Sequence, residues 1–222
     1  MRSITSDSQA EKEKMADQLI LFTRYPRPGK VKTRMVPALG ETGAARLHDK
    51  LTRRCLDRLL PLCANGEISF SVFYTGGSRR RMQAWLPGVS LVRQTGTDLG
   101  KRMIAAFSHA RTRGKKRILL MGSDCPDLSA AVIRQGLTAL RHHDLVIGPA
   151  HDGGYYLIGI GSRYAPADLH PLMDTIAWGT ANVLADTIAR IKNAGISYAL
   201  LPLLHDIDRP EDLEYFDYYT RS

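Results

Sequence analysis

The sequence predicts an α/β protein with one mainly parallel central sheet flanked by helices, and two observations lead to this prediction. Short apolar runs, each the length of a buried strand, alternate with segments of about 10–15 residues in which apolar residues recur at helical spacing. The apolar runs at 145–148 and 155–160 are joined by a short glycine-containing loop, which predicts a small antiparallel element. We therefore expect right-handed β-α-β units in the rest of the sheet.

Each predicted strand is a short apolar run bounded by polar or turn-forming residues. The first run ends at a basic loop that contains two prolines, and the fourth is followed by Gly122. This fourth run, Ile-Leu-Leu-Met, contains no polar residue and is typical of a strand covered on both faces. The predicted strands span residues 18–23, 68–74, 89–92, 118–121, 145–148, 155–160 and 196–201.

The predicted helices have apolar residues three and four positions apart, and several have a recognisable end. Ser129 can cap a helix that begins at Ala130. Gly114 and Gly195 can end two other helices, and Pro210 suits the first turn of the last one. The predicted helices span residues 41–60, 79–86, 98–113, 130–142, 182–194 and 210–219.

The chain is expected to fold as one domain. Residues 1–17 are polar and charged and predict an N-terminal arm, whereas residues 18–222 show no internal repeat, low-complexity tract or linker. The hydrophobic fraction of 44% and the charged fraction of 24% are ordinary for a globular protein. No apolar run approaches the roughly 18–20 residues that span a bilayer, and no secretory signal is recognisable, so we expect a cytoplasmic protein.

The formal net charge of +9 favours an anionic partner. Because the basic residues are scattered and match no motif that reads nucleic acid, a small phosphorylated ligand is favoured over nucleic acid. The three cysteines lack zinc-ligand spacing and predict neither a metal knuckle nor a disulfide framework. The composition is compatible with a homo-oligomer and does not decide the oligomeric state.

Asp124 is the first candidate site residue. It follows the buried strand at 118–121, and open α/β sheets bind ligands at the carboxyl ends of their strands. Asp127 and Ser129 are better placed to cap the next helix, which leaves the Asp124 carboxylate available. A metal ion that joins Asp124 to phosphate groups would fit a cationic loop beside it.

The loop after the first strand supplies such cations. Its basic residues surround Gly29, so backbone amides and positive side chains can converge on one anion. The loop has the spacing of neither a P-loop nor a dinucleotide-binding fingerprint, and a solvent-exposed basic loop is the alternative interpretation. The basic residues are Arg24, Arg27, Lys30, Lys32 and Arg34.

Two acidic segments complete the candidates. In His-Asp-Gly-Gly-Tyr-Tyr at 151–156, Gly153 and Gly154 allow close backbone approach to a ligand, although a plain hairpin turn explains the same residues. In the segment at 205–213, Asp208 is placed to cap a helix, with Glu211 at its third position. Asp206 and Asp208 point to the same side of an extended segment, so either could reach a metal instead.

Five segments, in this order, carry a resemblance to a known family. They read FTRYPRPGKVKTRM, GTDLGKRM, MGSDCPDLS, GPAHDGGYYLIG and DIDRPEDL, and the match runs from about Leu19 to Tyr215. The chain resembles a bacterial family of GT-A-like transferases, commonly labelled glycosyltransferase, within the nucleotide-diphospho-sugar transferase superfamily. That superfamily includes nucleotidyltransferases similar in plan to the molybdenum-cofactor and phospholactate guanylyltransferase enzymes.

The resemblance implies a GT-A Rossmann-like fold that binds a nucleotide together with Mg²⁺ or Mn²⁺. Asp124 falls on the first metal-binding acid of the superfamily, and Asp208 falls on the second. Arg209 and Gly179 depart from the residues usual in the family at their positions. The residues predicted to bind the nucleotide or its phosphates are Arg24, Gly29, Lys30, Lys32, Arg34, Asp98, Gly100, Gly153 and Gly154.

The predicted function is that of a metal-dependent transferase that uses an activated nucleotide. The family label favours transfer of a sugar from a nucleotide-diphospho-sugar to a small acceptor. The cationic loop suits a triphosphate and favours nucleotidyl transfer from an NTP with release of pyrophosphate. A non-catalytic nucleotide- or anion-binding protein is the third alternative. The candidate catalytic residues are Asp124, Lys32 and, as a candidate general base, Asp152.

Overall fold

The structure is a computed structural model that describes residues 16–64, 66 and 68–215. The predicted N-terminal arm lies outside these residues, apart from its last two. Of these two, Asp17 begins the first strand and pairs with Arg117 through two hydrogen bonds of 2.7 and 2.9 Å. No helix within the described ranges has the length and apolar character needed to cross a membrane.

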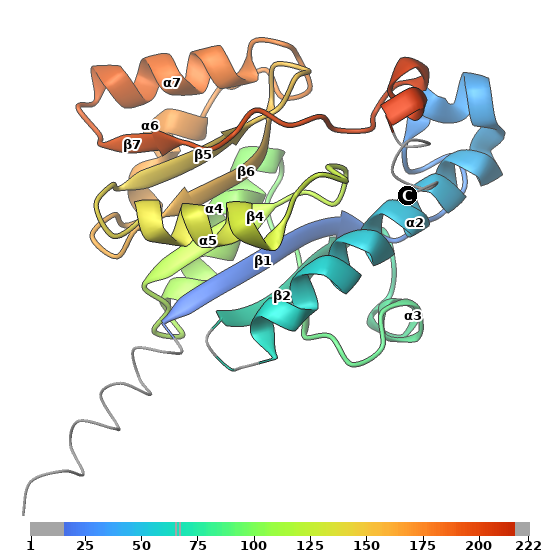
Figure 1. Cartoon of the computed structure of the whole chain (residues 1–222), viewed down its shortest axis with the longest axis horizontal. Helices are drawn as coiled ribbons and strands as arrows, with labels where there is room; N and C mark the ends of the chain where they lie inside the picture. Colours follow the sequence, from blue (N-terminus) through green and yellow to red (C-terminus); the bar gives the residue numbers. More distant parts are fainter. Residues whose placement is uncertain (1–15, 65, 67, 216–222) are drawn as a thin grey trace, which may run out of the picture.

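In the described part of the chain, one sheet of seven strands forms the centre of the fold, in the order β3-β2-β1-β4-β6-β5-β7 (Figure 1). All neighbouring strands are parallel except β6, which runs antiparallel to both β4 and β5. This confirms the predicted mainly parallel sheet and its small antiparallel element. The strands are β1 (Asp17–Arg24), β2 (Ile68–Thr75), β3 (Leu91–Arg93), β4 (Arg117–Met121), β5 (Leu145–Pro149), β6 (Tyr155–Ile160) and β7 (Tyr198–Leu200).

The helices agree with the predicted pattern except near the chain positions 36–40, 166–173 and 210–215. The first long helix starts earlier than predicted and kinks at Gly40, whose φ is 67°. The segment at 166–173 forms two short helical turns that were not predicted. The helices are α2 (Val36–Cys63), α3 (Arg79–Trp85), α4 (Leu99–Arg111), α5 (Ala130–Ala139), α6 (His170–Met173) and α7 (Val183–Asn193), and the 3-10 turns are η1 (Thr33–Met35), η2 (Pro166–Leu169) and η3 (Pro210–Asp212).

The terminal helix predicted from residue 210 begins with η3, and its continuation beyond residue 215 lies outside the described residues. Its predicted cap is wrong by one residue. The cap position is Arg209, and the carboxylate of Asp212 accepts hydrogen bonds from the backbone amides of Asp208 and Arg209. The Asp208 side chain is therefore not used as a cap and is left to make other contacts.

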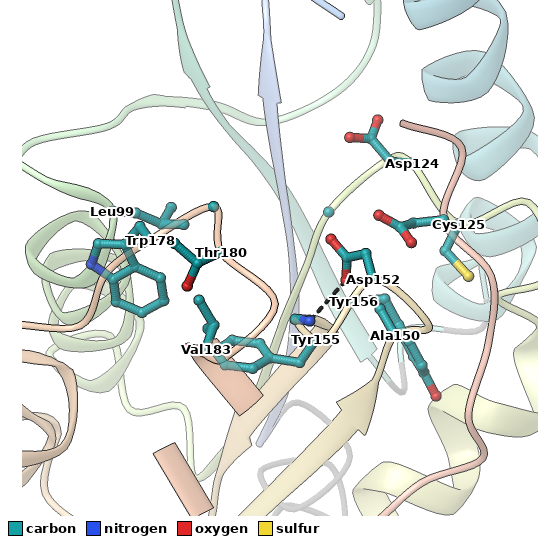
Figure 2. A pocket seen from close by; sticks show the side chains of 14 residues that line it. Leu99, Asp124, Cys125, Ala150, Asp152, Tyr155, Tyr156, Trp178, Thr180 and Val183 are labelled. Atoms are coloured by element: carbon teal, nitrogen blue, oxygen red, sulfur yellow. Dashed lines mark hydrogen bonds between the residues drawn. The ribbon is translucent and has the colours of Figure 1, made fainter. Parts of the chain in front are cut away.

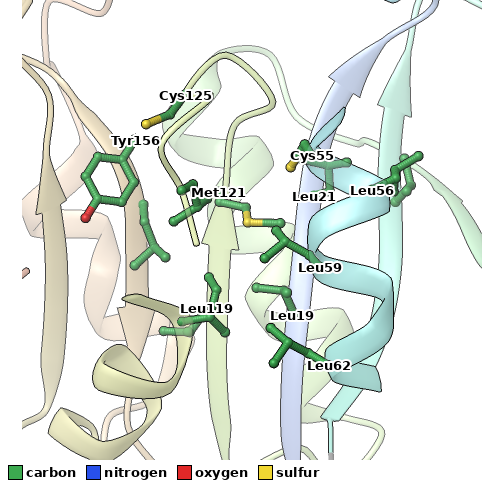
Figure 3. Close-up of a cluster of buried hydrophobic side chains, with 14 of the residues drawn as sticks. Leu19, Leu21, Cys55, Leu56, Leu59, Leu62, Leu119, Met121, Cys125 and Tyr156 are labelled. Atoms are coloured by element: carbon green, nitrogen blue, oxygen red, sulfur yellow. The ribbon is translucent and has the colours of Figure 1, made fainter. Parts of the chain in front are cut away.

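Two apolar layers bury both faces of the sheet. On one face, side chains of β1 and β4 such as Leu19 and Leu119 pack against Leu59 of α2, together with residues of α3 and α5 (Figure 3). On the other face, alternate residues of the same strands pack against α4, α6 and α7. Leu19, Leu59 and Leu119 are fully buried, which explains why the strands are continuous apolar runs.

The strand order places the candidate site. From β1 the chain proceeds to β2 on one side of the sheet, whereas β4 lies on the other side of β1, so the order reverses between β1 and β4. Ligands of open α/β sheets bind outside the carboxyl ends of strands at such a reversal. The segment after β7 also runs back to the start of α2 (Figure 1), where Ile207 joins an apolar cluster with Met35 and Leu51.

Candidate active site

The loop after β1 follows the predicted position and has two left-handed residues, which shape it. Gly29 has a φ of +68°, and a Cβ atom there would lie 2.8 Å from a carboxylate oxygen of Glu41. Lys32 has a φ of 47°, which is uncommon for a residue with a side chain. As a result Lys32 turns inward and is buried, while Arg24, Arg27 and Lys30 stay exposed.

Lys32 lies in a group of charges that we call the paired cluster, consisting of Lys32, Arg34, Asp124 and Asp208. The Lys32 ammonium is 2.8 Å from Asp124 Oδ2 and 3.4 Å from Asp208 Oδ1, and it donates to the Ile207 carbonyl at 2.5 Å. Arg34 binds the other oxygen of Asp208 at 2.5 Å. Two cations and two carboxylates therefore neutralise one another.

The backbone holds the two acids of the paired cluster together. The amide of Ile207 donates to the Asp124 carbonyl at 2.9 Å, which fixes the segment after β7 across the end of β4. Arg34 also donates to the Gly179 carbonyl at 3.0 Å. Gly179 has a φ of +83°, a conformation that favours glycine.

The charges of the paired cluster shift one another's protonation. Burial would lower the pKa of Lys32, but the carboxylates of Asp124 and Asp208 outweigh that effect and raise it above its ordinary value. Burial would likewise raise the pKa of Asp124, but the adjacent Lys32 ammonium lowers it below its ordinary value. Lys32 is therefore held as a cation and Asp124 as an anion.

His48 is a site residue that sequence reasoning missed. It lies on α2 and is buried, and burial lowers its pKa. Its Nε2 donates to the Arg24 carbonyl at 2.9 Å, and its Nδ1 lies 3.9 Å from Asp124 Oδ1. The imidazole thus connects the start of the loop after β1 to the candidate acid. A histidine on an apolar helix face is usually a core residue, so nothing in the sequence pattern marked His48 as a site residue.

A second region, the acidic pocket, opens beside Asp124 and has a volume of about 180 Å³. Three carboxylates contribute to its wall, from Asp124, Asp152 and Asp206. The described residues that line it include no lysine or arginine. Figure 2 shows Asp124 and Asp152 on one side and the rings of Tyr155 and Trp178 on the other, 6.3 Å apart between centroids.

Backbone pairing brings Asp152 and Asp206 into the acidic pocket together. Ala150 and Leu204 form a parallel bridge, so the two following dipeptides, both His-Asp, run side by side. The rings of His151 and His205 stack, with centroids 3.7 Å apart. Burial, and next the charge of Asp152, raise the pKa of Asp206 to about 6. The acidic pocket therefore carries negative charge that its own wall does not neutralise.

The remaining predicted residues have identifiable structural contacts. Asp152 Oδ1 accepts from the Gly154 amide at 2.8 Å (Figure 2), as in the hairpin-turn alternative, and a Cβ atom on Gly153 would lie 2.1 Å from the Ala181 carbonyl. Asp98 caps α4 by accepting from the Lys101 amide at 2.9 Å. A Cβ atom on Gly100, in the first turn of α4, would lie 3.0 Å from the Trp178 ring. Roles of these residues in nucleotide binding stay predictions.

The predicted metal pair does not fit a divalent cation as arranged here. Mg²⁺ and Mn²⁺ need several oxygen ligands around one point, but the Lys32 ammonium lies between Asp124 and Asp208. Within the described part of the chain, no three His, Cys, Asp or Glu side chains are grouped to hold a metal ion. The roles of Asp124 and Asp208 as metal ligands therefore stay predictions.

Comparison with known proteins agrees with the mostly parallel sheet and its flanking helices, which are those of the nucleotide-diphospho-sugar transferase fold. The chain belongs to the family described as "Uncharacterized protein conserved in bacteria (DUF2064)", whose model matches residues 59–180. No curated protein matches the sequence. A crystal structure from Desulfovibrio desulfuricans G20, described provisionally as a nucleotide-diphospho-sugar transferase, is 35% identical, with 88% of this chain and 83% of that chain covered and a TM-score of 0.79.

More distant structures share the fold. A cytidylyltransferase from Leptospira borgpetersenii is 15% identical, with 91% of this chain and 85% of that chain covered and a TM-score of 0.58. The 4-diphosphocytidyl-2C-methyl-D-erythritol synthase of Anaerococcus prevotii is 10% identical, with coverage of 96% and 99% and a TM-score of 0.59. These similarities confirm the predicted GT-A-like fold.

Proposed function

We propose that this chain is a glycosyltransferase that moves a sugar from a nucleotide-diphospho-sugar to a small acceptor. The observation that carries the proposal is the acidic pocket, which has three carboxylates and no lysine or arginine among its described lining residues. It adjoins the loop after β1 through Asp124, which pairs with Lys32 of that loop. An activated sugar has a matching division of charge, because its diphosphate is anionic and its sugar is neutral and rich in hydroxyl groups.

The acidic pocket suits a neutral sugar on chemical grounds. Carboxylates accept hydrogen bonds from hydroxyl groups, and the faces of Tyr155 and Trp178 offer apolar surface to a sugar ring. An acceptor with a phosphate or a carboxylate would meet Asp152 and Asp206 with no compensating cation in the wall, and like charges at close range repel. The third carboxylate, that of Asp124, is already paired with Lys32. The pocket thus favours an uncharged group next to Asp124.

The loop after β1 supplies the part of the proposed site that binds the diphosphate. Arg24, Arg27 and Lys30 are exposed there, and cations and backbone amides together bind phosphate groups. The paired cluster removes the negative charge that Asp124 and Asp208 would otherwise present to a diphosphate. We therefore infer that the diphosphate lies along this loop and the sugar in the acidic pocket.

In the proposed reaction, an acceptor hydroxyl attacks the anomeric carbon as the bond from that carbon to the diphosphate oxygen breaks. The nucleoside diphosphate leaves with an additional negative charge, which the exposed cations of the loop stabilise. Asp152 is the proposed general base. Its Oδ1 accepts a hydrogen bond from the Gly154 amide, which holds the carboxylate in place, and its Oδ2 is the oxygen proposed to take the proton.

Nucleotidyl transfer is the second candidate, favoured by the three exposed cations, which would also suit a triphosphate. A structure with the same fold and 11% identity, the CMP-2-keto-3-deoxy-manno-octonic acid synthetase, is complexed with CTP. Here an acceptor hydroxyl would attack the α-phosphate and pyrophosphate would leave. Only an uncharged acceptor would agree with the acidic pocket.

A thermal-shift panel separates these functions. Nucleotide-diphospho-sugars and NTPs with matched bases are added with and without Mn²⁺, and the released product is identified as a nucleoside diphosphate or as pyrophosphate. We expect stabilisation by a nucleotide sugar and release of the diphosphate. Stabilisation by triphosphates alone, with pyrophosphate release, would favour nucleotidyl transfer. No response to any nucleotide would contradict both transferase functions, and binding without turnover would favour a non-catalytic binding protein.

A further inference from the structure

The side chain of Lys32 is saturated with protein contacts. An ammonium group has three N–H donors, and the three acceptors around Lys32 Nζ are Asp124 Oδ2 at 2.8 Å, the Ile207 carbonyl at 2.5 Å and Asp208 Oδ1 at 3.4 Å. Only 2% of the side chain is exposed. Lys32 therefore has no donor left for a phosphate group while it stays in this position.

The position of Lys32 is also the position that a metal ion would need. A divalent cation shared by Asp124 and Asp208 would have to lie between their carboxylates, where the ammonium now lies. Metal–oxygen distances of about 2.0–2.6 Å would bring the ion close to Nζ, and two cations at such a distance repel strongly. The lysine and the metal ion therefore exclude each other.

We propose that the Lys32 ammonium is the resident cation of the Asp124–Asp208 pair and that a divalent cation binds these carboxylates only by displacing it. Displacement breaks the contacts of Lys32 to both acids and frees its three donors. In the absence of a nucleotide those donors have no replacement acceptor, so a metal ion alone binds weakly. Phosphate oxygens of a nucleotide on the same loop provide acceptors for the released ammonium.

This inference assigns Lys32 a different task from phosphate binding at rest. It does not depend on which group is transferred, since it concerns only the cation at Asp124 and Asp208. It shares Asp124 with the acidic pocket but requires neither Asp152 nor Asp206, because the groups around the Lys32 ammonium are Asp124, Asp208 and the Ile207 carbonyl. A failure of the glycosyl-transfer proposal would leave it untouched.

The first test measures binding of Mn²⁺ alone by electron paramagnetic resonance, without nucleotide. Lys32→Met removes the ammonium but keeps a side chain of similar length, and we expect it to tighten Mn²⁺ binding roughly tenfold or more. Lys30→Met is the matched control, because it removes the same charge from an exposed position of the same loop. Circular dichroism establishes that both variants are folded. Equal or weaker Mn²⁺ binding by a folded Lys32→Met variant would overturn the proposal.

The second test uses the unmodified chain, so it can test the proposed position of Lys32 even if the Lys32→Met variant does not fold. Reductive methylation followed by mass spectrometry reports which lysines are accessible. We expect Lys32 to react far more slowly than Lys30, and Mn²⁺ binding to make Lys32 reactive. Protection of Lys32 with no Mn²⁺ binding also supports the proposal. Rapid methylation of Lys32 without metal, or bound Mn²⁺ with Lys32 still protected, would overturn it.

Discussion

Asp206 and Asp208 stand two residues apart on the segment after β7, yet the fold treats their charges in opposite ways. Asp208, in the paired cluster, is within 3.4 Å of Lys32 through one oxygen and 2.5 Å of Arg34 through the other. Asp206, in the acidic pocket, faces Asp152 without a neighbouring cation in the pocket wall, and its pKa is raised to about 6. The paired cluster neutralises itself, whereas the acidic pocket keeps its negative charge.

This difference suggests a division of labour around Asp124, which belongs to both regions. Compensated charges near the loop after β1 allow anionic phosphates to approach. Uncompensated carboxylates repel anions and favour hydroxyl groups. Substitutions in either region, and of Asp124 which the two regions share, should therefore have different effects.

The largest effect is expected for Asp124→Asn, which removes charge from both regions at once. Turnover of the proposed reaction should fall by about 10²–10³-fold or more, the range found when one group that stabilises a transition state is removed. Steady-state kinetics measures the change, and Asp127→Asn, three residues along the same loop, is the control. Retention of most activity by a folded Asp124→Asn variant would remove Asp124 from the active site.

Within the paired cluster, the buried cation should matter more to stability than the exposed one. Lys32→Met removes the partner of two carboxylates, and breaking a buried ion pair costs about 3–5 kcal/mol, with the lower end expected because 40% of the Asp124 side chain is exposed. Arg34→Met should cost about 1 kcal/mol or less, since 47% of the Arg34 side chain is exposed. Urea unfolding measures both, and equal losses would contradict the difference in burial.

In the acidic pocket, Asp206→Asn should stabilise the fold at high pH and not at low pH. The pKa of Asp206 is about 6 in the folded chain against an ordinary value of 3.8. Below pH 3.8 the group is protonated in both states, and above pH 6 it is ionised in both, so ionisation destabilises the folded state as the pH rises between these values. We expect the Tm of the variant at pH 8 to rise by about 2–4 °C, or about 1 kcal/mol.

At pH 4 the same variant should melt within experimental error of the original chain. The exposed Asp57→Asn change on α2, measured at the same two pH values, serves as the control for loss of a carboxylate. A stabilisation of Asp206→Asn that is the same at pH 4 and pH 8 would show that Asp206 is not held in an unfavourable charged state.

Most of the fold can be predicted from the sequence for a physical reason. Strands buried on both faces, such as β1 and β4, must be continuous apolar runs, and a cap such as Ser129 identifies where a helix begins; its side chain does accept from the Val132 amide. The helical turns at 166–173 escape prediction because they are too short to show a period. The predicted cap of the last turn is the wrong acid, because Asp208 and Asp212 both have a spacing that allows capping. In the structure the Asp212 carboxylate accepts the hydrogen bonds from the backbone amides.

The sequence predicts which residues belong to the candidate site, but it does not predict which of them contact one another. Asp124 and the loop after β1 are recognisable because each follows an apolar run. The contact between Lys32 and Asp124 depends on β1 lying next to β4, which strand order decides and local spacing does not. The contribution of Asp206 to the pocket cannot be predicted for a related reason. Asp206 lies beside Asp152 because a parallel bridge joins Ala150 to Leu204, and these residues are far apart in the sequence.

The most direct test of the central claim compares two nucleotide sugars that differ in one charge. A nucleoside diphosphate hexose and the uronic acid with the same base and ring are titrated into the chain by calorimetry. If the acidic pocket holds the sugar, the neutral hexose should bind about tenfold or more tightly than the uronic acid, and Asp206→Asn should narrow that ratio. Equal or tighter binding of the uronic acid would contradict the claim that uncompensated carboxylates select the transferred group.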